Sequence, residues 1–153
     1  MTLVTVRGQL EHNTEKRIQL FDGRFDTGYV VKEFWLYPNT GIGAGNDAHG
    51  VLYTESGVVA NGLSWDWSSN YQIGWAAGVF GGGTSHSDHD GNGIIDPENL
   101  IIEDLYIIAA HSASGTTGYM ITLEKVDLSE AAGALAMVRN KSQGSDATGP
   151  ENQ

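Results

Sequence analysis

Cysteine is absent from the 153 residues of the chain, which excludes disulfide bridges, thiolate metal sites and thiol nucleophiles. Basic residues are also few: 8 Lys and Arg stand against 19 Asp and Glu, for a formal net charge of −11. An acidic surplus of this size argues against nucleic acid and anionic membranes as partners. No apolar run approaches the roughly 18 residues of a membrane-spanning helix. The first residues lack the basic-then-apolar pattern of a secretion signal, so we expect no export by that route.

Proline is rare, at 3 residues, whereas glycine is common, at 21. Together with many β-branched and aromatic residues, this composition is typical of short strands joined by tight turns. We therefore expect an all-β fold, an antiparallel β-sandwich or jelly roll of about seven to eight short strands. The expected strands cover residues 3–10, 17–21, 28–37, 49–54, 65–67, 71–80, 100–110 and 119–127. The last two are expected to pair like a hairpin across residues 111–117.

Side chains alternate between the two faces of a strand, so the sequence predicts which residues share a face. The last strand should direct its odd-numbered apolar side chains to one side: Tyr119, Ile121 and Leu123. The strand at 28–37 should likewise carry on one face Val31, Glu33, Trp35 and Tyr37. Glu103 and Asp104 should lie on opposite faces, which is unsuitable for acid–base work on one substrate. The inward carboxylate of these two should form a buried pair or a subunit contact.

The segment after Asp127 changes character, because apolar residues now recur at helical spacing. Asp127 and Glu130 resemble a helix capping box, and the apolar stripe continues through Leu135 and Val138. Residues 145–153 are polar and are expected to form an arm without structure of its own. The sequence therefore predicts a β-sandwich domain at residues 1–127, followed by a short helix and polar tail at 128–153.

Between Asp88 and Asn99 the chain reads Asp-His-Asp-Gly-Asn-Gly-Ile-Ile-Asp-Pro-Glu-Asn, the spacing of a calcium-binding loop. The expected metal ligands are Asp88, Asp90, Asn92, the Ile94 carbonyl and Asp96, with Glu98 or Asn99 completing the shell. Asn99 stands where a bidentate glutamate is usual, and no helices flank the loop. We therefore expect a weak structural calcium site, with a dissociation constant on the order of 10⁻⁴ to 10⁻³ M. An ordinary surface turn is the alternative, since Gly, Asp and Asn are also the best turn formers.

Other candidate sites lack part of the chemistry they would need. His111 and Ser112 are adjacent but have no identifiable third partner, and Gly41–Gly45 lacks the lysine of a phosphate loop. His86 and His89 lie on a glycine-rich stretch that is more typical of an exposed loop than of a transition-metal site. We expect no catalytic residues and no enzyme activity. The four tryptophans are expected to pack in the core or at an interface: Trp35, Trp65, Trp67 and Trp75. A platform for stacking sugar rings is the alternative.

Several stretches of the sequence resemble small virion structural proteins of marine tailed bacteriophages. They are Val6-Arg-Gly-Gln-Leu10 with His12-Asn-Thr-Glu15, the segment Ile102-Glu-Asp-Leu105, and the ending Gly133-Ala-Leu-Ala-Met-Val-Arg-Asn-Lys-Ser-Gln143. The resemblance touches both ends and the middle of the chain, but not residues 88–96. It implies a non-enzymatic protein that functions by position, in many copies, as a head-surface (decoration), minor capsid or tail-associated subunit.

The partners implied by this resemblance are copies of the chain itself and other virion proteins, without nucleic acid or membrane. The implied location is the virion, after assembly in the host cytoplasm. Calcium is expected from the loop spacing alone, not from this resemblance, as a structural ion that holds an acidic loop. The alternative interpretation is a calcium-dependent carbohydrate-binding β-sandwich module, with tryptophan side chains on one face of the sandwich.

Overall fold

The structure is a computed structural model that describes residues 2–39, 46–79 and 92–128. No α-helix forms within these ranges, in agreement with the predicted all-β class. The strands are β1 (Thr2–Leu10), β2 (Lys16–Ile18), β3 (Thr27–Pro38), β4 (Asp47–Tyr53), β5 (Gln72–Val79), β6 (Ile94–Ile95), β7 (Leu105–His111) and β8 (Thr117–Asp127).

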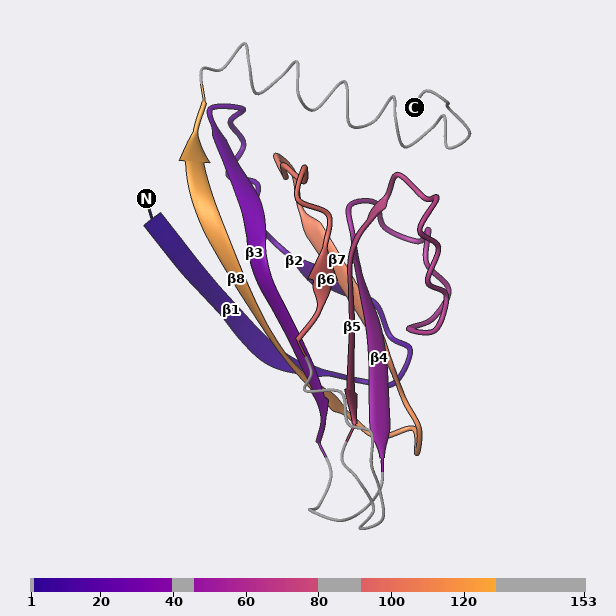
Figure 1. Ribbon diagram of the computed structural model, residues 1–153. Helices are drawn as coiled ribbons and strands as arrows, with labels where there is room; N and C mark the ends of the chain where they lie inside the picture. Colours follow the sequence, from indigo (N-terminus) through magenta and orange to yellow (C-terminus); the bar gives the residue numbers. More distant parts are fainter. Residues whose placement is uncertain (1, 40–45, 80–91, 129–153) are drawn as a thin grey trace.

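These strands form two antiparallel sheets. The small sheet has the order β1-β8-β3, and the large sheet has the order β2-β7-β4-β5-β6. The sheets lie face to face, with β3 packed over β4, β5 and β6 (Figure 1). The β-sandwich predicted from the sequence is therefore confirmed.

The main core fills the space between the sheets. Phe34 contributes from the small sheet, and Leu52 and Ile107 contribute from the large sheet, all with 0% exposure. Burying one such side chain stabilises the fold by about 1.5–3 kcal/mol. The alternation predicted for β8 is confirmed, because its inward residues are all buried: Tyr119, Ile121 and Leu123.

The predicted alternation in β3 is wrong at one point, because a β-bulge interrupts the strand between Val31 and Glu33. Val31 lies opposite Leu123 and is buried, whereas Glu33 lies opposite Thr122 and is exposed. A bulge adds one residue to a strand and so reverses which face the following residues occupy. Val31 consequently shares the inward face with Phe34 and Leu36, not the outward face with Trp35 and Tyr37.

A second apolar cluster lies on the other face of the large sheet, beneath the connection between β4 and β5. Its buried members are Val51, Tyr53, Val59, Trp75 and Ile108. Glu15 fastens this connection to the sheet. The Glu15 carboxylate accepts hydrogen bonds from the Tyr53 hydroxyl at 2.7 Å, the Ser56 hydroxyl at 2.6 Å and the Gly57 N–H at 2.9 Å.

The strand expected at residues 65–67 does not form, and these residues are part of the connection over the second cluster. Local hydrogen bonds replace a sheet ladder there. The Trp65 indole N–H donates to the Gly62 carbonyl at 2.9 Å, and the Asp66 N–H donates to the Gln72 side chain at 2.9 Å.

The hairpin expected between the last two strands is also wrong. β7 pairs with β2 and β4 in the large sheet, whereas β8 pairs with β1 and β3 in the small sheet. The reason is that β7 is apolar on both faces and needs a position between the two apolar clusters. The strand expected from residue 100 begins at Leu105. Residues 94–95, expected inside a calcium loop, form the short strand β6.

The predicted C-terminal helix and polar tail lie outside the described residues, apart from Leu128. The Leu128 N–H donates to the Asp26 carbonyl at 2.8 Å, immediately after β8 ends at Asp127. No helix within 2–39, 46–79 or 92–128 has the length and hydropathy needed to cross a membrane.

Candidate functional site

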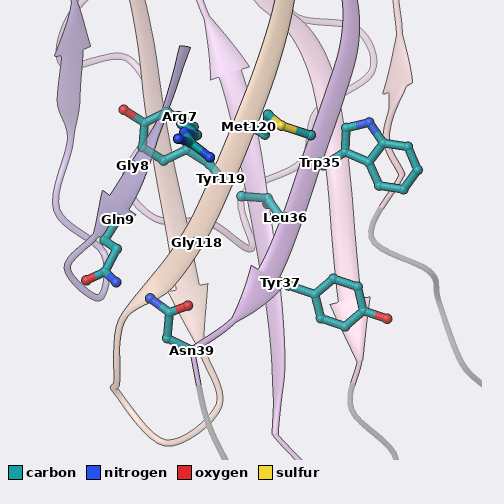
Figure 2. A pocket seen from close by; sticks show the side chains of 10 residues that line it. All are labelled: Arg7, Gly8, Gln9, Trp35, Leu36, Tyr37, Asn39, Gly118, Tyr119 and Met120. Carbon is teal, nitrogen blue, oxygen red and sulfur yellow. The ribbon is translucent and has the colours of Figure 1, made fainter. Parts of the chain in front are cut away.

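A shallow groove of about 520 Å³ lies on the outward face of the small sheet (Figure 2). Two rows of residues cross the three strands there. One row places Arg7 of β1 beside Met120 of β8 and Trp35 of β3. The next row consists of Gln9, Gly118 and Tyr37.

Gly118 creates the hollow, because it has no side chain between Gln9 and Tyr37. A Cβ atom added there would lie 3.1 Å from the Asn39 side-chain oxygen, so a larger residue would crowd Asn39. Figure 2 shows Trp35 and Tyr37 projecting from β3 on one side, and Arg7 and Gln9 from β1 on the other. The bulge in β3 determines this arrangement, since it turns the two aromatic residues outward.

The chemistry of this groove is apolar and aromatic. Trp35 and Tyr37 are half-buried, Met120 is 38% exposed, and Arg7 is exposed. Among the lining residues that the structure describes, Arg7 is the one charged side chain, and none carries a carboxylate or an imidazole. Such a surface can hold an apolar or aromatic partner surface.

A second groove, of about 340 Å³, lies beside the second apolar cluster. Its main feature is Trp67, which is 59% exposed and stacks on the buried ring of Trp75. The two ring centroids are 4.2 Å apart, with an interplanar angle of 24°. Asn70 and Asp96 also line this groove, so an exposed aromatic face lies near polar side chains.

The predicted calcium ligands fall into two groups. Asp88 and Asp90 lie outside the described residues. Asn92 and Asp96 lie within them and are exposed, one on each side of β6. The Ile94 carbonyl belongs to β6, where Ile94 pairs with Trp75. Among the described residues, no group of three or more His, Cys, Asp and Glu converges on a common point.

Asn99 has a different position from the other predicted ligands, because its side chain is buried and bonded to the backbone. Its Oδ1 accepts the Val31 N–H at 2.8 Å, and its Nδ2 donates to the Asp96 carbonyl at 2.7 Å. Glu98, the other residue expected to complete the shell, is exposed, and its N–H donates to the Asp96 carboxylate at 3.0 Å. Glu98 is therefore better placed than Asn99 for a metal.

Of Glu103 and Asp104, Asp104 is the buried carboxylate, and it pairs with Arg17, whose side chain is 57% exposed. It accepts the N–H groups of Leu20 at 2.9 Å and Phe21 at 3.1 Å, and the Arg17 guanidinium at 2.6 Å. Partial burial raises the pKa of Asp104, but these three donors outweigh burial and hold the pKa below its ordinary value. The carboxylate therefore stays charged and anchors the segment after β2.

Glu15 behaves in the same way. Burial raises its pKa, but the hydrogen bonds from Ser56, Gly57 and Tyr53 bring the net pKa below the ordinary value. The Tyr53 phenol has its pKa raised, because it is buried and donates to this carboxylate. Neither Glu15 nor Asp104 therefore has the raised carboxyl pKa that suits a general acid at neutral pH.

His111 and Ser112 do not face each other. The His111 Nδ1 accepts the N–H groups of Ala113 at 3.0 Å and Gly115 at 3.1 Å. The Ser112 hydroxyl accepts the Asp47 N–H at 3.0 Å. The His111 side chain therefore stabilises the turn between β7 and β8, and the Ser112 side chain connects this turn to the start of β4.

Neither groove was expected as such from the sequence. Trp35 and Tyr37 were expected to share a face, which the structure confirms. Their neighbours Arg7 and Met120 come from strands whose register no local pattern specifies. Among the tryptophans, Trp75 packs in the core as expected, whereas Trp67 is exposed.

No protein-family model matches the chain, and no curated protein matches it. Among solved structures, a chain of the Bacillus endospore appendages, described as a novel family of disulfide-linked pili, is similar at 14% identity. The similarity covers 84% of this chain and 90% of that chain, with a TM-score of 0.31. A likeness at this level carries no conclusion about function.

Proposed function

We propose that this protein is a non-enzymatic structural subunit, present in many copies in a bacteriophage virion as a decoration or minor capsid protein. The groove on the small sheet is the observation that carries this proposal. Its lining combines Trp35, Tyr37, Met120 and Arg7, which are the residue types enriched at protein interfaces. Trp, Tyr and Arg are also the residues that most often dominate binding energy.

The use of buried carboxylates supports the same proposal. Asp104 and Glu15 both bond to backbone N–H groups and have lowered pKa values. They therefore stabilise loops against the sandwich in their charged forms. A rigid sandwich with firmly attached connections suits a subunit that works by position.

The virion assignment rests on the sequence resemblance described above. Other virion proteins and copies of this chain are the partners, and the virion is the location. The segment from Asp88 to Glu98 would hold a structural calcium ion. Calcium there would reduce repulsion among carboxylates in a chain with a net charge of −11.

Replacing Trp35 with alanine should weaken assembly at least about tenfold, as expected for an interface hot spot. The fold should persist, because Trp35 lies on the outward face of β3 and not in the core. The measurement is co-sedimentation of purified chain with particles that lack it, together with far-ultraviolet circular dichroism. Trp67→Ala is the matched control, since it removes an exposed tryptophan from the other groove. Equal binding by the parent chain and Trp35→Ala would contradict the proposed role of this groove.

A carbohydrate-binding module is the second candidate function, and the position of Trp67 favours it. An exposed indole supported by a second ring is a suitable surface for stacking a sugar ring. Asp96, a predicted calcium ligand, lines the same groove.

In that case Trp67→Ala should abolish glycan binding measured by calorimetry, and Trp35→Ala should leave it intact. Binding should also require millimolar calcium, and the double variant Asp88→Ala, Asp90→Ala should not bind glycan even when calcium is present. Glycan binding that follows this pattern, in a chain that does not bind particles, would decide for the second function. Absence of binding to a broad glycan array would decide against it.

A further inference from the structure

In the described part of the chain the two sheets have four outermost strands, and three of these are short or covered. The large sheet ends in β2, with 3 residues, and β6, with 2 residues. Such short edges offer little backbone for pairing. The outermost strands of the small sheet are β3 and β1, and they differ in how far other segments cover their outer edges.

The outer edge of β3 is covered by the segment from Gly93 to Ile101. Tyr29 and Ile101 exchange two backbone hydrogen bonds, at 2.8 and 2.7 Å. The Val31 N–H donates to Asn99 at 2.8 Å, and the Gly93 N–H donates to the Phe34 carbonyl at 2.7 Å. The bulge after Val31 further disrupts this edge.

Among residues 2–39, 46–79 and 92–128, no segment covers the outer edge of β1. β1 contains 9 residues and pairs with β8 in an unbroken register from Thr2 to Leu10. Within the described part of the chain, its only backbone hydrogen bonds are those with β8. It contains no proline and no bulge, and it lies at the outer side of the small sheet (Figure 1).

The side chains of β1 also suit an interface. Leu3 is 55% exposed and Val4 is 36% exposed, and these neighbours lie on opposite faces of the strand. Arg7 is its one charged residue, although the chain as a whole has a net charge of −11. Contact between two copies through β1 therefore brings no carboxylate of this strand against another.

We propose that β1 pairs antiparallel with β1 of a second copy, about a two-fold axis at Val6. This inference rests on the proposed function and names the contact through which copies meet. A second copy fits because a strand added at this edge must be apolar on its inward face, and in so acidic a chain it should bring no further carboxylate. β1 itself has this pattern, and a two-fold axis at Val6 pairs the whole strand.

This register has specific consequences. Leu3 lies opposite Gln9 of the second copy, and Thr5 lies opposite its Arg7, on the same outward face. The two small sheets become one continuous sheet. Arg7 and Gln9 also line the groove of Figure 2, so the copies of this groove in the two chains lie on one surface, on either side of the β1–β1 contact.

Two variants with opposite charges at residue 5 test the register. Thr5→Lys places a positive charge opposite Arg7 twice per dimer, whereas Thr5→Glu places a negative charge there. Because like charges opposite one another are unfavourable and unlike charges favourable, the dimer dissociation constants of the two variants should differ about tenfold or more, with Thr5→Lys weaker. Sedimentation equilibrium of the full chain measures these constants. Leu63→Lys, at a residue 65% exposed in the β4–β5 connection, is the control and should match the parent chain.

Cross-linking gives an independent readout, because the parent chain has no cysteine. Val6→Cys should form a disulfide-linked dimer under mild oxidation, whereas Leu3→Cys alone should not. A mixture of Leu3→Cys and Gln9→Cys should cross-link. Suppose that the parent chain self-associates, but Thr5→Lys and Thr5→Glu have equal dissociation constants and Val6→Cys does not cross-link. The proposed β1–β1 contact is then wrong, and the proposed function stands. A parent chain that stays monomeric and is absent from particles overturns both.

Discussion

Replacing Gly62 with alanine should destabilise the protein by about 3 kcal/mol or more. A Cβ atom at this position would lie 2.2 Å from the Ala110 nitrogen and 2.3 Å from the His49 carbonyl oxygen. Both are backbone atoms of central strands in the large sheet, so neither can move without breaking a ladder. The connection over the second apolar cluster would have to lift away, and overpacking of this kind is among the more damaging single changes.

Gly23→Ala is the matched control, because it separates crowding from backbone strain. Gly23 has a φ of +89°, and an added Cβ would meet nothing within 4 Å. Its replacement should cost only about 1–2 kcal/mol, from the left-handed conformation alone. Urea unfolding of both variants gives the two free energies. A cost for Gly62→Ala no larger than that for Gly23→Ala would mean that this connection is not seated on the sheet as described.

Removing the Asp104 side chain should have the second large effect, a loss of about 2–4 kcal/mol at neutral pH. Asp104→Ala leaves the N–H groups of Leu20 and Phe21 without their acceptor, and unsatisfied donors at a partly buried site are unfavourable. The Arg17 side chain is 57% exposed, so its ion pair contributes little to this total. Asp104→Asn keeps an oxygen acceptor and should lose less.

The pH dependence of this effect has a definite sign. The pKa of Asp104 is lowered in the folded state, so its contribution is complete above the unfolded-state pKa of about 3.9 and disappears as pH falls through the folded-state pKa. The difference in unfolding free energy between the parent chain and Asp104→Asn should therefore shrink below about pH 4. Thermal unfolding from pH 7 to pH 2 measures this difference. A difference that stays constant over that range would show that the carboxylate charge contributes nothing.

Strand positions were largely predictable because they depend on local alternation, but strand partners were not. In β8, inward residues such as Ile121 and Leu123 alternate with exposed Met120, which fits a sheet with one open face. In β7, consecutive residues are buried, including Ile107 and Ile108. That continuous apolar run indicates burial on both faces and could have separated β7 from β8.

The bulge in β3 was not predictable from its own sequence. The side chain of Asn99 stabilises it by bonding to the Val31 backbone, across 68 positions of the chain. The outward direction of Trp35 and Tyr37 relative to Val31 thus depends on a distant residue. The hollow at Gly118 depends in turn on the register of three strands, which only the assembled sheet specifies.

Multi-copy assembly is the central claim, and sedimentation velocity of the full chain over a wide concentration range, with and without millimolar calcium, tests it most directly. We predict species heavier than one chain that increase with concentration, because the groove of the small sheet and the β1 edge both offer contact surface. A single species of one-chain mass at every concentration, in both conditions, would contradict the claim.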